Sequence, residues 1–179
     1  PVSTKASWLP RGMRLALQDR PPEAAPGAPH WREVDPGFEV GELSANVGAE
    51  EVDRLLLARI DPARFRFVVR NDPQARRGLD GWMRSLDAVL VVNGSYFART
   101  GLPSTPVVSE GRALGPASYN GVHGAFVASA DRAEIRDLAG IDWRQAFANA
   151  DNALVSYPLL LAADGSHRVP PDSGWLANR

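Results

Sequence analysis

The chain has 179 residues, of which 44% are hydrophobic and 23% charged, and its formal net charge is −1. These ordinary values predict a globular protein with a real core and argue against a disordered chain. The near-neutral charge and the lack of a basic stripe predict no nucleic-acid partner. No run reaches the roughly 18 apolar residues of a membrane span, so no membrane span is expected. The absence of cysteine excludes disulfides, thiolate metal sites and a cysteine nucleophile.

The first 30 residues differ in composition from the rest of the chain. Prolines recur there among alanines and charged residues, at Pro10, Pro21, Pro22, Pro26 and Pro29. Proline lacks a backbone donor and interrupts helices and central strands. The pattern therefore predicts a proline-rich N-terminal extension over residues 1–30, followed by a folded domain over residues 31–179.

The first part of this domain shows strand patterns and then one helix. Trp31–Phe38 predicts a strand and a turn, and Leu57–Val69 predicts a strand, a turn and a second strand over Phe65–Val69. Gly78–Asp87 predicts a short helix. Its apolar residues fall at helical spacing and predict a core-facing side, formed by Leu79, Trp82, Met83 and Leu86.

Residues Ala88–Val92 form an apolar run that stops at Asn93-Gly94-Ser95, and Tyr96 and Phe97 follow at once. The run has the length of a strand buried on both faces. A polar turn at the end of such a strand is a common place for ligand-binding groups. The simpler interpretation is a plain turn, with both aromatic rings packed in the core.

Turn signals and short strands dominate the remainder. Residues 98–122 predict a long loop with a brief strand near Val107 and a hairpin turn at Glu110. Further elements are expected at Gly124–Ala128, at a helix from Asp142 to Asn149 with Asp142 as N-cap, at a strand over Ala153–Ser156 and at a turn over Asp164-Gly165. Strands with few helices and no βαβ alternation predict an α+β fold with a mixed or antiparallel sheet.

Taken in order, these motifs resemble the phosphodiester glycosidase family. Members of this family usually contain three sequence motifs: Asn-Gly-(Gly/Ser/Thr)-(Tyr/Phe)-Phe, a later Gly-Pro-Leu-Leu, and an Asn-Arg before a final strand-rich half. The chain matches the first at Asn93–Phe97 and the last at Asn178-Arg179. It departs from the middle one, because Ser156-Tyr157-Pro158 stands where the family has Ala-Gly-Pro. The best-known member removes N-acetylglucosamine from a mannose phosphodiester.

The resemblance implies a hydrolase that cleaves a glycosyl phosphodiester. It implies that sugar and phosphate are held by Asn93, Gly94, Ser95, Tyr96 and Arg179, and that Tyr157 lines the cavity in place of the family's glycine. The alternative interpretation of Arg179 is a solvated terminal arginine, and that of Tyr157 is a residue packed in the core. His123 is a candidate proton donor, because histidine titrates near neutral pH and glycines surround it. Its alternative is a structural, hydrogen-bonded histidine.

Two other functions stay open: a non-catalytic domain that binds an envelope glycan or an anionic sugar, and a structural domain. No histidine–carboxylate spacing suggests zinc and no phosphate-binding loop is present, so neither metal nor cofactor is expected. The resemblance covers about half of a family domain, which predicts a second polypeptide that completes the sheet. The family is largely exported, which implies a periplasmic or secreted location.

Overall fold

A computed structural model describes residues 27–47, 49–119, 123–166 and 168. The chain divides into two compact units. The first combines the residues up to Phe65 with Arg77–Val92, and the second combines Arg66–Arg76 with the residues from Asn93 onward. Within the described residues, no helix is long and apolar enough to cross a membrane. The prediction of a proline-rich extension lies largely outside the described residues.

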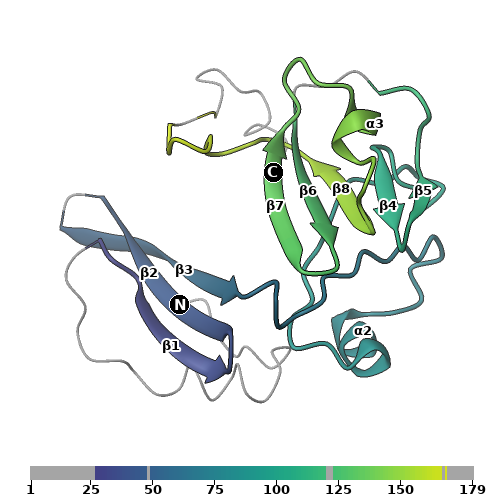
Figure 1. The fold of residues 1–179 in the computed structure, drawn as a ribbon. Coiled ribbons are helices and arrows are strands. Elements are labelled where there is room, and N and C mark those ends of the chain that lie inside the picture. The colour runs from purple at the N-terminus through teal and green to yellow at the C-terminus, as the bar shows by residue number, and fades with distance from the viewer. Residues whose placement is uncertain (1–26, 48, 120–122, 167, 169–179) are drawn as a thin grey trace. The chain divides into compact units, whose positions relative to one another are not determined.

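The first unit contains an antiparallel sheet of order β1-β2-β3, seen at the purple and blue end of Figure 1. Its strands are β1 (His30–Asp35), β2 (Phe38–Val47) and β3 (Glu50–Ile60), which confirms the predicted strand before the first turn and the predicted strand that begins at Leu57. Gly37 makes that turn with φ of +82°, a value that glycine adopts without steric cost.

A small core lies on this sheet. Phe38 and Val40 are buried, and the hydrophobic residues packed on them are Val34, Ile60, Phe65, Val89 and Leu90. The rings of Phe38 and Phe65 meet edge to face, with 6.1 Å between their centroids.

The helix predicted over Gly78–Asp87 is present as α2 (Leu79–Leu86). Asp87 ends it in the left-handed conformation, and the Ala88 N–H bonds to the Met83 carbonyl at 3.0 Å. The expected core face is only half-buried at Leu79, Trp82 and Met83, and Leu86 is exposed.

The strand predicted over Ala88–Val92 is wrong. This segment has no ladder partner among the described residues, and Val92 is 70% exposed. Val89 and Leu90 instead pack their side chains on Phe38 and Val40. The apolar run therefore reflects burial against one small core, and it does not reflect a strand covered on both faces.

The second unit contains an antiparallel sheet of order β5-β4-β8-β6-β7 (Figure 1). Its strands are β4 (Val107–Ser109), β5 (Arg112–Leu114), β6 (Gly124–Ser129), β7 (Arg132–Asp137) and β8 (Asn152–Ser156). Two mainly antiparallel sheets with few short helices confirm the α+β class. The predicted strands near Val107 and over Ala153–Ser156 are also confirmed, as is the hairpin turn at Glu110.

The core of this unit lies between the sheet and a short helix, α3 (Trp143–Ala146). Its buried residues are Val108, Ala125, Val127, Leu138, Ala146, Phe147, Ala153 and Val155. The Asp142 carboxylate accepts the Arg144 N–H at 2.9 Å, which confirms the predicted N-cap. The helix ends at Ala146, earlier than the predicted Asn149, because Phe147 already leaves helical geometry.

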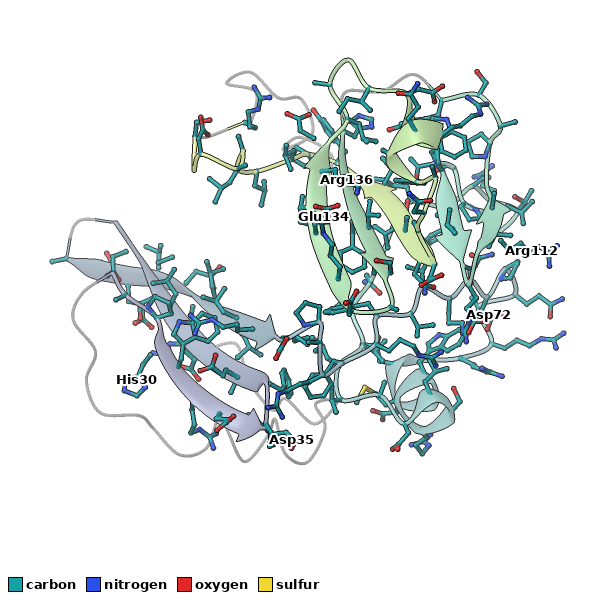
Figure 2. All side chains as sticks on the ribbon, in the orientation of Figure 1. His30, Asp35, Asp72, Arg112, Glu134 and Arg136 are labelled. Carbon is teal, nitrogen blue, oxygen red and sulfur yellow. The ribbon has the colours of Figure 1, made fainter. Side chains whose placement is uncertain are left out.

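The outer strand β7 was not anticipated from the sequence. Figure 2 labels Glu134 and Arg136 on this strand, and the Arg136 Nε donates to the Glu134 carboxylate at 2.7 Å. Arg136 also donates to the Ala146 carbonyl of α3. A charged side chain therefore links the edge of the sheet to the helix.

The strand predicted over Phe65–Val69 is also wrong. The chain passes from the first unit to the second within this segment, and side chains take the place of a backbone ladder. The buried amide of Asn152 accepts the N–H of Val69 at 2.9 Å, and the Ser109 hydroxyl donates to the Val69 carbonyl at 2.7 Å. The backbone N–H and C=O of Val69 are thus satisfied without sheet pairing.

Candidate functional site

The turn after Asn93 is anchored to β8 by hydroxyl groups. The Ser95 Oγ donates to the Val155 carbonyl at 2.7 Å. The Thr105 Oγ1 lies within hydrogen-bond distance of both the Ser95 Oγ and the same carbonyl, and its single proton serves one of them at a time. Thr105 is buried, with 7% of its surface exposed. Ser95 is therefore held by protein groups, and its hydroxyl positions the turn.

Tyr96 links the same turn to the end of β8. Its hydroxyl donates to the Tyr157 carbonyl at 2.5 Å, while half of the residue stays exposed. The hydroxyl of Tyr96 is therefore held in place, while its ring remains accessible to solvent. An aromatic side chain of this kind can stack on a sugar ring.

His123 lies immediately before β6 and contacts two tyrosines. Its Nδ1 shares a hydrogen bond with the Tyr119 hydroxyl. Its ring meets the Tyr157 ring edge to face, with 4.6 Å between centroids. The chain contains three tyrosines, and all three belong to this chain of contacts, which we call the Tyr–His cluster: Tyr96, Tyr119, His123 and Tyr157.

Burial lowers the pKa of the His123 imidazole below its usual range, because the charged form loses solvation. The imidazole is therefore neutral at pH 7. A neutral imidazole offers one nitrogen as donor and the other as acceptor. When Nδ1–H donates to the Tyr119 oxygen, Nε2 carries the lone pair and can accept a proton.

Gly94, beside Ser95, and Gly124, beside His123, both face protein atoms. A Cβ on Gly124 would lie 2.9 Å from the Leu159 Cδ1, and one on Gly94 would lie 3.0 Å from the Leu154 Cδ2. The space at Gly124 is thus taken by Leu159 packing against the start of β6. Gly124 therefore leaves no room for a ligand on this side of His123.

The remaining predicted site residues are placed differently. Asn93 is exposed, so its amide faces solvent. Arg179 lies outside the described residues, so its predicted contact with phosphate stays a prediction. In the described part of the chain, no group of three or more acidic, histidine or cysteine residues is arranged to hold a metal ion.

Sequence reasoning missed Tyr119 and Thr105. Tyr119 stands four residues before His123, but residues at that spacing meet predictably only in a helix, and the sequence predicts a loop here. Thr105 sits in a loop rich in small polar residues, where nothing local distinguishes it from its neighbours. Both are revealed only by the partners that the fold brings to them.

Comparison of the chain with known proteins adds no relative. No protein-family model, no curated protein and no solved structure matches it.

Proposed function

We propose that the protein is a hydrolase of glycosyl phosphodiesters and that the Tyr–His cluster is its reaction site. The observation that carries the proposal is that Tyr119 and Tyr157 both contact His123, while Tyr96 donates its hydroxyl to the Tyr157 carbonyl. The motif order along the chain supports the substrate class, since it resembles the phosphodiester glycosidases. The same resemblance supports a periplasmic or secreted location.

The cluster supplies two kinds of group that this reaction needs. The half-exposed ring of Tyr96 offers a surface on which a sugar can stack, and the solvent-facing amide of Asn93 offers donors to hydroxyl or phosphate oxygens. His123 supplies the acid–base function. Because its pKa is lowered, it acts as a base: Nε2 takes a proton from the attacking water as the bond to the phosphate oxygen breaks, the phosphate monoester leaves as its anion, and the imidazolium then returns the proton to solvent.

Replacing His123 with alanine tests the proposal. We expect turnover of an N-acetylglucosamine–phosphate–mannose diester to fall by roughly 10²–10⁴-fold, the usual contribution of a positioned acid or base. His30→Ala, on β1 in the first unit, is the matched control and should leave turnover unchanged. Equal turnover in the wild type and in His123→Ala would remove His123 from the mechanism.

A second candidate function is binding without cleavage. Glycoside hydrolysis uses two groups on opposite sides of the bond, commonly carboxylates. The lowered pKa of His123 has burial as its cause, with no charged neighbour acting on it among the described residues. This observation favours a domain that holds an envelope glycan or an anionic sugar.

Thermal stabilisation separates the two functions. Under the binding hypothesis, the diester raises the melting temperature and no product forms, since a ligand that binds only the folded state stabilises it. Tyr96→Ala should then reduce the stabilisation, because the stacking surface is lost. Product release in the same sample would rule out a purely binding function.

A further inference from the structure

The outer strand of the first unit has an open edge. β3 runs over Glu50–Ile60 and, among the described residues, pairs only with β2 (Figure 1). It also exposes large apolar side chains: Val52 is 57% exposed, Leu55 47% and Leu56 40%. Long apolar edge strands are normally covered, because their free N–H and C=O groups pair readily with another strand.

The pattern of charges along β3 is complementary to that of a second copy of the strand that runs antiparallel to it. Asp53 lies in its first half, and Arg59 lies near its end. An antiparallel copy therefore brings the acidic part of one strand beside the basic part of the other. A parallel copy would place like charges together.

One antiparallel register matches side chains along most of the strand. When Leu56 lies opposite Leu56, the remaining pairs follow from the residue numbers: Leu55 with Leu57, Arg54 with Ala58, Asp53 with Arg59, and Val52 with Ile60. Leu56, Leu55 and Val52 then meet apolar residues, Arg54 faces Ala58, and the Asp53 carboxylate meets the Arg59 guanidinium. The like-charged pair in this register is Glu51 opposite Asp61, and Asp61 lies beyond the end of β3.

We propose that two copies of this chain associate through β3, antiparallel and around a two-fold axis at Leu56. The two three-stranded sheets then form one continuous sheet. The backbone groups of each edge gain partners, and the exposed leucines of one copy cover those of the other.

The charges of the sheet agree with this arrangement. The Arg59 guanidinium lies 3.0 Å from a Glu39 carboxylate oxygen and 4.0 Å from the centroid of the Trp31 ring. Its position is thus already set by its own sheet, and Asp53 of the second copy adds a carboxylate next to an ordered cation. The association involves the first unit and is independent of the function proposed for the Tyr–His cluster.

A single cysteine tests the two-fold axis. The chain has no cysteine, so Leu56→Cys can pair only with its own copy. Directly opposed residues in antiparallel strands have Cα atoms about 4.5–5.5 Å apart, within the roughly 4.4–6.8 Å of a disulfide. We expect Leu56→Cys to form a disulfide-linked dimer under mild oxidation.

Ile135→Cys is the matched control, because Ile135 is 65% exposed on the outer strand β7. It should stay monomeric on a non-reducing gel under the same conditions. Crosslinking of Leu56→Cys no faster than that of Ile135→Cys would overturn the proposal.

Sedimentation of the unmodified chain provides a second, independent measurement. We expect a dimer at micromolar concentrations and a monomer for Leu56→Lys, which places two ammonium groups together at the axis. Ile135→Lys should remain dimeric, and circular dichroism should show that both variants are folded. A monomeric wild type, or a Leu56→Lys variant that is still dimeric, would refute association through β3.

Discussion

Ser95 and Tyr96 are adjacent in the sequence, and each donates its hydroxyl proton to a backbone carbonyl near the end of β8. The difference between them lies in what remains accessible. The hydroxyl of Ser95 is engaged by its hydrogen bonds to Val155 and Thr105. In contrast, half of Tyr96 stays exposed although its hydroxyl is hydrogen-bonded. Ser95 therefore positions the turn, and Tyr96 is the residue of the pair that can meet a ligand.

His123 makes the stability of the protein depend on pH. Its pKa is lower in the folded protein than in the unfolded chain, so between the two values the unfolded chain binds more protons. The contribution of the neutral buried imidazole is thus complete above about pH 6.5, the unfolded value, and decreases as the pH falls toward the folded value. Melting temperatures measured from pH 8 to pH 5 should show this loss.

The variant His123→Gln isolates the effect, because glutamine does not titrate. Its melting temperature should fall less steeply with decreasing pH than that of the wild type. Parallel curves for the two proteins would contradict the assignment of this pH dependence to His123.

The loop that carries Tyr96 closes on itself. Phe97 and Pro103 form an isolated bridge, the Ala98 N–H bonds to the Leu102 carbonyl at 2.9 Å, and the Ser104 N–H bonds to the Tyr96 carbonyl at 3.0 Å. Gly101 makes the tight turn, with φ of +77°. The aromatic residues after Asn93 are therefore placed by a compact loop.

Gly101→Ala should open this loop. Its Cβ would lie 2.0 Å from the Pro73 carbonyl oxygen, a clash with backbone that adds to the cost of positive φ. We expect a loss of more than about 2 kcal/mol in the free energy of unfolding, measured by urea denaturation.

Gly111 provides the matched control. It has a similar φ of +74°, but a Cβ there would meet nothing within 4 Å. Gly111→Ala should therefore cost only the conformational strain, about 1 kcal/mol. Equal losses in the two variants would show that the contact with Pro73 does not limit the loop.

At the scale of the whole molecule, each unit has its own sheet and its own buried cluster. Phe38 and Val40 form the buried part of one, and a larger set around Val155 forms the other. The Tyr–His cluster lies entirely within the second unit, and the β3 edge lies within the first. The proposed reaction site and the proposed association surface can therefore be tested separately.

Separate cores predict separate unfolding transitions. Phe38→Ala should destabilise the first unit by roughly 3–5 kcal/mol, and Leu138→Ala should destabilise the second by roughly 2–5 kcal/mol, since both side chains are almost fully buried. In differential scanning calorimetry, we expect each variant to shift one transition. One common transition, shifted by both variants, would show that the units unfold cooperatively.

Local signals in the sequence were sufficient where local interactions form the element. The spacing of Leu79, Trp82 and Met83 predicted α2, and the carboxylate of Asp142 predicted the start of α3. The α+β class followed from strand and turn patterns in the same way. Each of these features depends on residues within a few positions of one another.

The sequence by itself thus determined the class of fold, most strands and both helices of the described part of the chain. The tertiary structure decided that Ala88–Val92 is not a strand, that Ser95 is held by Thr105 and Val155, and that Tyr119 meets His123. An apolar run records only that burial is favourable, because the hydrophobic effect has no direction. Which groups cover the run, and which side chains meet across the sheet, depends on contacts between segments distant in sequence.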